Sequence, residues 1–510
     1  MTPDHDFVTL DPTPEEFREL GYRVVDTIVD HYNHVEDVPV LSDATPEAVD
    51  SSFDEPVPKE GTDPDRILDD WDERVYPNAA HQGSPRWFGY VNGSGTPMGV
   101  LADALAASVN MNVGGWVLSP SATEMERQCI EWLAEMIGYP TDGGGVLTSG
   151  GTMANQVALY AALQSATDFS LRQTGFAGRD VDERFTLYES DHEHHSSITR
   201  VAEMIGIGRD AIRTVPVDES YRMDIEALAE IVEADVDDGV TPFAVVAQVG
   251  SINVSAIDPL EEIADVCADH DLWMHADGAC GAVGAIVPEK APMYAGLERA
   301  DSVTLDPHKW LSIPYGCGCV LFRDEYVQAR TFSMEASYLD VSKREEYQGT
   351  NYAFLGPEMS RPFRALKLWM NLKHRGLEGY RTLLAQSCTC AEHLHERVLE
   401  EADLEALQEP NLFIYSFRYV PATLQDRADE HDESRDVDTY ADWLNQQIAD
   451  DLRFSGLAYV TTTTVRGNVV LRFSICSHRT TPEDIDVTVD AILDHGERID
   501  GEERERFIPW

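Results

Sequence analysis

Short apolar runs alternate with amphipathic segments through the middle of the chain, from about residue 140 to residue 325. Segments 224–232 and 260–267 have helical periodicity. Continuous apolar runs joined by helices are typical of a mostly parallel sheet that helices cover on both faces. The pattern therefore predicts an α/β fold, with strands at Phe185–Tyr188, Phe243–Val249, Leu272–His275, Ser302–Leu305 and Cys319–Phe322.

The segment before this region has a different pattern. Thr13-Pro14-Glu15-Glu16 combines an N-cap residue, a first-turn proline and a glutamate three residues after the cap, which predicts a helix start. One amphipathic helix buries too little area to fold alone, so we expect this arm to pack on a second subunit. Residues 36–64, rich in Pro, Asp and Glu, are predicted to be a linker. The apolar positions at helical spacing are Phe17, Leu20, Val24, Ile28 and Tyr32.

The last part of the chain is predicted to be a smaller α+β unit. A helical pattern over Ser360–Leu377, interrupted by Gly376 and Gly379, leads into it. The acidic stretch Asp426–Asp438 is predicted to be a solvated loop. The predicted strands of this unit are Leu412–Arg418 and Val469–Ile475.

The chain has 510 residues, of which 43% are hydrophobic, so it is long enough to bury a large core. We expect three parts: a helical arm at 1–80, a large α/β domain at 81–378 and a small α+β domain at 379–510.

Acidic residues dominate the composition along the whole chain. There are 92 Asp and Glu against 38 Lys and Arg, and the formal net charge is −54. Such a surface repels nucleic acid and anionic membranes, and no run of about 18 apolar residues could span a bilayer. We interpret the charge as typical of a salt-rich cytoplasm, where ions screen self-repulsion. The first residues lack the features of a signal peptide, which also predicts a cytoplasmic location.

The eight cysteines are expected to be reduced thiols in such a compartment. Cys317-Gly318-Cys319 and Cys388-Thr389-Cys390 both lack the two-residue spacing of zinc sites. The loop Asp191–Ser197 contains histidines and carboxylates without a fixed spacing. Metal ligation is one interpretation of this loop, and an imidazole stacked on a flat cofactor is the other; we predict no metal.

Lys309 is the most informative single residue. The chain has only six lysines, and this one follows the apolar run Ser302–Leu305 directly beside His308. A lysine at the end of a buried strand is either a surface residue whose amine reaches water or an amine kept for covalent chemistry. In the second case, desolvation would lower the pKa of the amine towards its neutral form.

Two further motifs follow short apolar segments. Gly150 and Gly151 open an apolar helix, and a glycine-rich helix start presents free N–H groups that suit a phosphate. A simple helix cap is the alternative. Asp277 ends another strand, and it needs a partner because an unpaired buried carboxylate is costly. A protonated ring nitrogen is one such partner, and the next helix start is another.

In this chain order, the phosphate cradle, Asp277 and Lys309 resemble the group II pyridoxal-5′-phosphate-dependent amino-acid decarboxylases, those related to aromatic-L-amino-acid decarboxylase. The resemblance runs from about residue 80 to residue 380. It implies pyridoxal phosphate as the cofactor and a homodimer with shared active sites. It also implies the fold type I of pyridoxal phosphate-dependent transferases: a mostly parallel seven-stranded sheet in a large domain, a small C-terminal α+β domain and an N-terminal helical arm. The segments that carry it are Ser84–Tyr90, Val113–Trp116, Ser119–Glu124, Ser149–Asn155, His195–Ser197, Asp306–Trp310 and Phe363–Lys367.

The resemblance also implies a role for each matching residue. Lys309 would hold the cofactor covalently, and Asp277 would keep its ring nitrogen protonated. Tyr338 matches a loop tyrosine that returns a proton to the substrate carbon, in a loop that would close over the partner's site. The expected catalytic residues are thus Lys309, Tyr338, His195 and Asp277. The expected cofactor contacts are Lys309, Asp277, His195 and Ala279 on the two ring faces, Gly151, Thr152 and His308 at the phosphate, and Ser251. The expected substrate pocket consists of Asn112, Gly114, Trp116, Tyr90 and Ser360.

The implied reaction is decarboxylation of an L-amino acid to its amine and CO₂, with an aromatic substrate similar to tyrosine, DOPA or tryptophan favoured. The alternatives are a decarboxylase of glutamate, aspartate or 2,4-diaminobutyrate, and an aromatic aldehyde synthase, although Tyr338 argues against the synthase because those relatives typically carry Phe there. The stretch before His195 is one residue longer than usual, so His194 is the alternative stacking residue. Asn112 and Gly114 stand where animal relatives have larger apolar residues, and Cys280 replaces a common aromatic.

Overall fold

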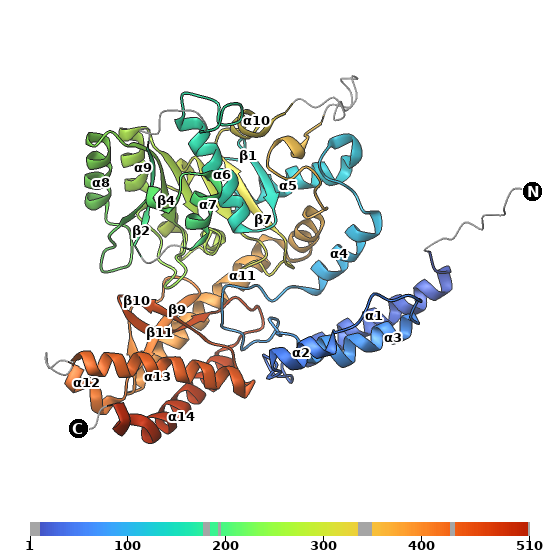
Figure 1. The fold of residues 1–510 in the computed structure, drawn as a ribbon, viewed down its shortest axis with the longest axis vertical. Helices are drawn as coiled ribbons and strands as arrows, with labels where there is room; N and C mark the ends of the chain where they lie inside the picture. The colour runs from blue at the N-terminus through green and yellow to red at the C-terminus, as the bar shows by residue number, and fades with distance from the viewer. Residues whose placement is uncertain (1–10, 177–183, 192–194, 335–348, 429–433, 508–510) are drawn as a thin grey trace, which may run out of the picture.

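A seven-stranded sheet forms the centre of the molecule (Figure 1). The computed structural model describes residues 11–176, 184–191, 195–334, 349–428 and 434–507. The strands are β1 (Gly144–Thr148), β2 (Phe185–Ser190), β3 (Ile212–Val215), β4 (Thr241–Gln248), β5 (Trp273–Asp277), β6 (Ser302–Leu305) and β7 (Gly318–Phe322). Their order is β1-β7-β6-β5-β4-β2-β3, and among these strands β7 is the one that runs antiparallel to its neighbours. The predicted mostly parallel sheet is therefore confirmed.

Helices cover both faces of this sheet. They are α5 (Pro120–Met136), α6 (Gly151–Ala166), α7 (Ser197–Ile205), α8 (Ile225–Asp237), α9 (Leu260–His270) and α10 (Val327–Phe332), whereas α4 (Pro97–Val109) packs against the helix at residues 365–400. Successive side chains of a strand point to opposite faces. Along β4, Ala244 and Val246 pack in a cluster with α6 and α7, whereas Val245 and Ala247 pack in a cluster with α8 and α9. This double burial explains why the strands are continuous apolar runs.

Two strands of the large sheet, β1 and β3, were not predicted. β1 contains Gly144 and Gly145, and glycine is depleted in strands. A Cβ on Gly145 would lie 2.7 Å from the side chain of Ile130, so the glycine lets α5 pack closely against β1. β3 is short and partly exposed, which removes the apolar pattern that identifies the central strands.

A long helix, α11 (Ala365–Glu400), connects the two sheets. The helix predicted over Ser360–Leu377 starts later, at Ala365, but its predicted interruption at Gly376 is confirmed: this residue has the non-helical angles φ 68° and ψ 169°, and a second helical segment follows the kink. The interruption predicted at Gly379 was wrong, because its backbone is helical. The solvated loop predicted for Asp426–Asp438 was also wrong, because helices occupy most of that stretch: α12 (Ala422–Ala428) and α13 (Ser434–Ser455).

The C-terminal part is built on a second, antiparallel sheet of order β10-β11-β9-β8. Its strands are β8 (Leu404–Ala406), β9 (Ile414–Tyr419), β10 (Thr461–Val465) and β11 (Asn468–Ser474), and α14 (Pro482–Phe507) packs with α13 beside it. The two predicted strands correspond to β9 and β11. The division of the chain at residues 80 and 378 stays a prediction.

The N-terminal helices are α1 (Pro14–His34), α2 (Pro46–Ser52) and α3 (Pro64–Asp70), and they extend away from the body of the molecule in Figure 1. The predicted helix start is confirmed, because the Thr13 hydroxyl accepts the Glu16 N–H and the Glu16 carboxylate accepts the Thr13 N–H. The segment predicted as a linker contains α2. No helix of the described residues is long and apolar enough to cross a membrane.

Candidate active site

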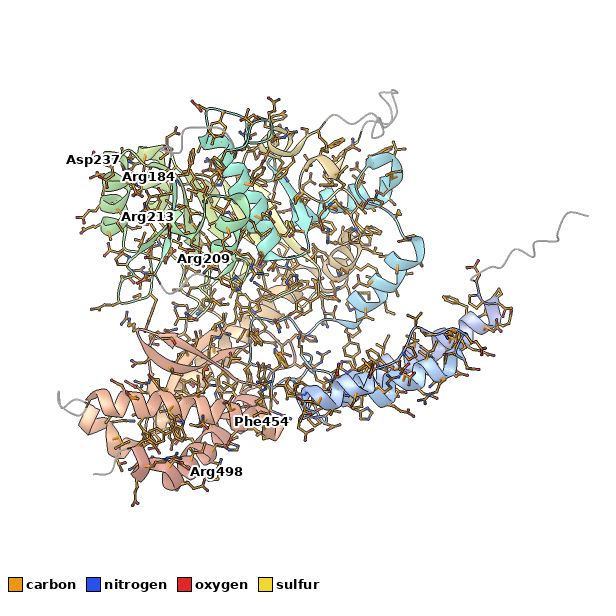
Figure 2. The ribbon with its side chains drawn as sticks, in the orientation of Figure 1. Arg184, Arg209, Arg213, Asp237, Phe454 and Arg498 are labelled. Carbon is orange, nitrogen blue, oxygen red and sulfur yellow. The ribbon has the colours of Figure 1, made fainter. Side chains whose placement is uncertain are left out.

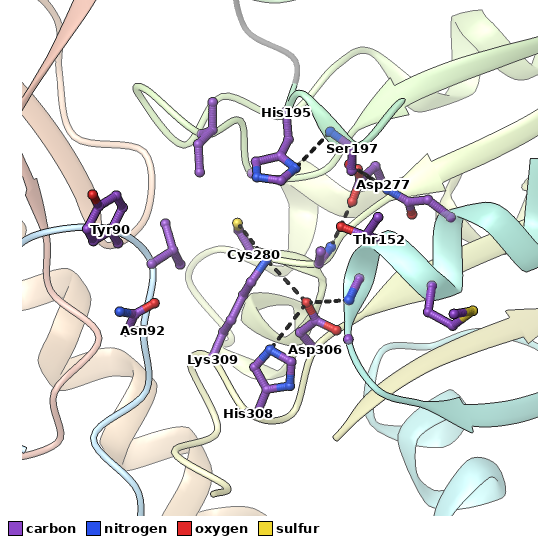
Figure 3. Close-up of a pocket in the computed structure, with 18 of the residues that line it drawn as sticks. Tyr90, Asn92, Thr152, His195, Ser197, Asp277, Cys280, Asp306, His308 and Lys309 are labelled. Carbon is purple, nitrogen blue, oxygen red and sulfur yellow. Dashed lines mark hydrogen bonds and ion pairs between the residues drawn. The ribbon is translucent and has the colours of Figure 1, made fainter. Parts of the chain in front are cut away.

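A cavity of about 670 Å³ opens where the large sheet meets the C-terminal sheet (Figure 3). It lies beyond the carboxyl ends of β1, β4, β5 and β6, which is where α/β folds bind their ligands. The predicted site residues that line it together are Tyr90, Gly151, Thr152, His195, Asp277, Ala279, His308 and Lys309.

Lys309 lies in the turn after β6, with its amine directed into the cavity in Figure 3. Its Nζ is 3.2 Å from Asp306 Oδ2 and 3.6 Å from Cys280 Sγ. Burial lowers the pKa of the Lys309 amine, but the acidic groups of Cys280, Asp306 and Asp277 raise it more, so the pKa lies above its usual value. The expectation of a lowered pKa was therefore wrong for the protein without a cofactor, because it ignored the carboxylate beside the amine.

Asp277 is the last residue of β5, and its buried carboxylate is held by two donors. The side-chain amide of Asn155 donates to Oδ2 at 2.8 Å, and the Ala279 N–H donates to Oδ1 at 3.2 Å. Asn155 also contacts the His275 ring at 3.1 Å, and burial lowers the pKa of His275 to about 4, with Asp277 opposing the shift. His275 is thus neutral, and the carboxylate of Asp277 lines the cavity.

The N-terminus of α6 forms the cradle expected for a phosphate. The N-cap residue, Gly150, has no side chain to cap this helix, and the Gly151 N–H donates instead to Oδ2 of the more distant Asp306 at 2.9 Å. A Cβ on Gly150 would lie 3.0 Å from the His308 ring, so only glycine allows this close approach. The His308 Nδ1 accepts the Cys317 N–H at 3.2 Å, and burial lowers the pKa of His308, so its ring is neutral.

His195 lies on the open side of the cavity, where its Nδ1 accepts the Ser197 N–H at 3.1 Å (Figure 3). The residue is exposed, but nearby protein still desolvates the ring; this desolvation lowers the pKa of His195, and the positive charge of Lys309 lowers it further. Ser251 is buried, its hydroxyl accepts the Ala256 N–H at 3.1 Å, and its neighbours Gly250 and Ile252 line the cavity.

The other predicted pocket residues do not line the cavity of the single chain. They are Asn112, Gly114, Trp116 and Ser360. Asn112 Oδ1 accepts the N–H groups of Gly114 and Arg361, each at 3.0 Å. Their role in a substrate pocket stays a prediction. Tyr338 and His194 lie outside the described residues.

Three residues of the site were not predicted: Asn155, Asp306 and Arg472. Asn155 lies one helical turn after Gly151, so its position on the same helix face was detectable. Asp306 directly follows the apolar β6, as Asp277 ends β5. Arg472 comes from β11 of the C-terminal sheet. The signal in the sequence that could have identified it is a charged residue inside an otherwise apolar strand.

This donor set fits pyridoxal phosphate. The glycine-rich helix start suits the phosphate, the carboxylate of Asp277 suits a protonated ring nitrogen, and the Lys309 amine suits the aldehyde. Fold and site together define a pyridoxal phosphate enzyme of fold type I.

Comparisons with known proteins agree with this class. The family model described as the pyridoxal-dependent decarboxylase conserved domain matches residues 46–420. The aromatic-L-amino-acid decarboxylase of Bacillus atrophaeus is 33% identical over 92% of this chain and 93% of its own length. A phenylacetaldehyde synthase of Petunia hybrida is 27% identical over 94% of both chains. The crystal structure of Oryza sativa TDC with PLP and tryptamine superposes with a TM-score of 0.88 at 28% identity, covering 97% of this chain and 99% of that one.

The chain therefore belongs to the pyridoxal-dependent decarboxylase family. It is a pyridoxal phosphate-dependent amino-acid decarboxylase, a carboxy-lyase.

Proposed function

We propose that this enzyme decarboxylates an aromatic L-amino acid to the corresponding amine. The observation that carries the proposal is the convergence of Lys309, Asp277 and the α6 helix start on one cavity. The aromatic substrate is supported by relatives aligned along nearly the whole chain, whose names refer to aromatic amino acids, tryptophan and tyrosine.

Bound pyridoxal phosphate supplies an electron-withdrawing ring that accepts the electron pair left behind when CO₂ departs. Lys309 would hold the cofactor through its aldehyde. Asp277, oriented by Asn155, would keep the proton on the ring nitrogen. His195 and Ala279 would contact the two faces of the ring.

Arg472 is the group we assign to the substrate carboxylate. Its side chain is buried and lines the cavity, and it donates to the Ile252 carbonyl at 3.1 Å and to the Thr461 hydroxyl at 3.3 Å. Among the described residues, no acceptor pairs with its Nε–H. A guanidinium fixed in this way can hold a carboxylate in one orientation while the carbon–carboxylate bond breaks. Tyr338 then returns a proton to the substrate carbon.

We also propose a homodimer in which the N-terminal arm packs on the partner. The apolar residues of α1 are exposed in the single chain: Phe17 is 69% exposed and Val29 48%. Leu101, Leu105 and Val109 form a second exposed apolar stripe along α4. Association would bury both surfaces and bring Asn112, Gly114, Trp116 and Ser360 towards the partner's cavity. Sedimentation velocity tests this: a monomer at micromolar concentration in high salt would contradict it.

The acidic composition supports a further proposal about habitat, a salt-rich cytoplasm. The net charge of −54 requires screening by salt.

The experiment that tests the reaction measures amine, aldehyde and CO₂ over a panel of aromatic, acidic and diamino L-amino acids. We expect CO₂ and amine in equal amounts from an aromatic substrate. Lys309→Ala should lose turnover and the product of borohydride trapping. A trapped lysine adduct in Lys309→Ala would contradict the assignment.

The aldehyde synthase named among the relatives is the second candidate. Tyr338→Phe separates the two activities. Without the phenol, return of the proton slows and oxygen competes for the substrate carbon, so amine output should fall about 10²–10⁴-fold. Aldehyde, ammonia and peroxide should appear instead. An unchanged amine yield without aldehyde would remove Tyr338 from the mechanism, whereas aldehyde from the unmodified enzyme would favour the synthase.

A further inference from the structure

We propose that Asp306 competes with the phosphate of the cofactor for the α6 cradle, so that its carboxylate limits how tightly this enzyme holds pyridoxal phosphate. The inference rests on the proposed phosphate site at Gly150, Gly151 and Thr152. It concerns a residue that the reaction itself does not require.

The competition follows from the two contacts of one oxygen. Asp306 Oδ2 accepts the Gly151 N–H at 2.9 Å and pairs with Lys309 Nζ at 3.2 Å. A backbone N–H is a single donor. The Gly151 N–H is the first N–H of α6 and has no acceptor within the helix. The Asp306 carboxylate therefore already occupies the position that another anion would take at this helix start.

The carboxylate has little room to withdraw. Its side chain is 1% exposed. A Cβ on Gly318 would lie 2.6 Å from Asp306 Oδ1, and a Cβ on Gly151 would lie 2.7 Å from Asp306 Oδ2. Packing on both sides therefore holds the negative charge in place. Among the described residues, Asp306 Oδ1 has no hydrogen-bond donor.

The neighbouring groups compensate only part of this charge. His308 Nε2 lies 3.7 Å from Asp306 Oδ2, but burial lowers the pKa of His308, so the ring is neutral at neutral pH. The remaining cation in contact is the Lys309 amine, which Asp277 and Asp306 share as a charge partner. A phosphate that enters the cradle thus meets a fixed carboxylate at close range, and this repulsion must weaken its binding.

Asp306→Asn tests the proposal, because an amide of the same size keeps an oxygen for the Gly151 N–H and removes the charge. Cofactor-free enzyme is titrated with pyridoxal phosphate and, separately, with pyridoxal, which has the same ring and aldehyde but no phosphate. The readout is the ratio of the two dissociation constants, followed by absorbance at fixed pH and salt. Loss of the ion pair to Lys309 affects both ligands alike, so the ratio isolates the phosphate.

We expect Asp306→Asn to raise the preference for pyridoxal phosphate over pyridoxal by at least tenfold. Asp306→Ser, smaller and neutral, should shift it in the same direction and serves if the amide variant does not fold. The matched control is Asp103→Asn, which removes one negative charge that pairs with Lys367 at 3.3 Å outside the cavity. It should leave the ratio unchanged.

Two outcomes would overturn the inference. If the wild-type ratio is large and Asp306→Asn leaves or lowers it, the cradle stands and Asp306 only caps the helix. If neither the wild-type enzyme nor Asp306→Asn binds pyridoxal phosphate more tightly than pyridoxal, the cradle assignment fails, and the inference fails with it. An equal gain in the Asp103→Asn control would assign the effect to overall charge instead of Asp306.

Discussion

The charge state of single residues in the cavity depends on the polar contacts that each makes. Asp277 is buried, yet two donors hold its carboxylate, and Asn155 links it to a neutral His275. Lys309 has its pKa raised by the acidic groups around it, which outweigh burial. In the protein without cofactor the Lys309 amine is therefore a cation. It becomes a nucleophile only when an incoming ligand changes the electrostatic surroundings of the amine and lowers its pKa.

At this scale, Asp277→Ala should remove most activity and leave the cofactor bound. The ring nitrogen would lose the group that keeps its proton, whereas Lys309 and the α6 helix start are untouched. We expect a loss in kcat of at least tenfold, roughly 1.4 kcal/mol. Asn155→Ala, which frees one oxygen of Asp277, should show a smaller loss in the same direction. Absorbance of the bound cofactor and steady-state rates measure both, and a loss below tenfold for Asp277→Ala would make the residue structural.

Glu189 gives a prediction about pH and stability. Burial raises the pKa of this carboxyl to about 8, and the charge of Asp277 adds to the shift, from a usual value of 4.5. A folded state that holds the proton more tightly loses stability as pH rises from the unfolded value through the folded one. Glu189→Gln, which stays neutral, should therefore raise the melting temperature most above about pH 8 and little near about pH 4.5. Exposed Glu219→Gln is the control, and equal melting curves at high pH would contradict the prediction.

A site residue could be predicted from the sequence when it lies next to a recognisable strand end or helix start, and not when it comes from a distant part of the chain. Lys309 and Asp277 lie at or just beyond the ends of predicted strands, where α/β folds bind ligands, and Gly151 was recognisable as part of a glycine-rich helix start. Arg472 comes from a different sheet, and no periodicity in the sequence brings β11 to the cavity. The cavity walls at Tyr90 were predicted by resemblance alone.

At the scale of elements, the central strands were predictable because burial on both faces makes them continuously apolar. The break in α11 at Gly376 was also predictable, because glycine adopts the positive φ that interrupts the helix there. The predicted start at Ser360 was wrong, since the helix begins at Ala365. The helices that extend into Asp426–Asp438 were missed because the high density of acidic residues was interpreted as a solvated loop.

The kink in α11 can be tested with a matched pair of substitutions. Gly376 has φ 68° and ψ 169°, and a Cβ there would meet nothing within 4 Å, so Gly376→Ala costs only backbone strain. We expect destabilisation by about 1–3 kcal/mol. Gly379 is helical and a Cβ would meet only Arg375 at 3.4 Å, so Gly379→Ala should stabilise by about 0.5–1 kcal/mol. Denaturant unfolding measures both, and changes of the same sign would show that the kink carries no strain.

At the scale of the whole molecule, acidic residues greatly outnumber basic ones, and the protein has a large net negative charge. Arginines on its surface are paired with nearby acids: Arg209 pairs with Glu203, and Arg498 pairs with Asp451. Figure 2 labels both arginines. Such exposed pairs contribute little to stability, about 0–1 kcal/mol each. Because acids exceed bases by 54 charges, most acidic groups have no cation to share, and the folded chain carries a repulsion that unfolding would relieve.

Thermal unfolding at different salt concentrations should reveal this repulsion. The screening length falls from about 30 Å at 0.01 M salt to about 3 Å at 1 M. A net charge of −54 spread along the whole chain is thus unscreened in dilute buffer and screened between neighbouring groups in molar salt. We expect the melting temperature of the holoenzyme to rise by several degrees with sodium or potassium chloride, and most steeply at the lowest concentrations, where the screening length changes fastest. Sucrose, which favours compact states without screening charge, is the control and should not reproduce this steep initial rise. A melting temperature that is flat from dilute buffer to molar chloride would contradict the prediction, and it would mean that the excess carboxylates are compensated within the folded protein itself.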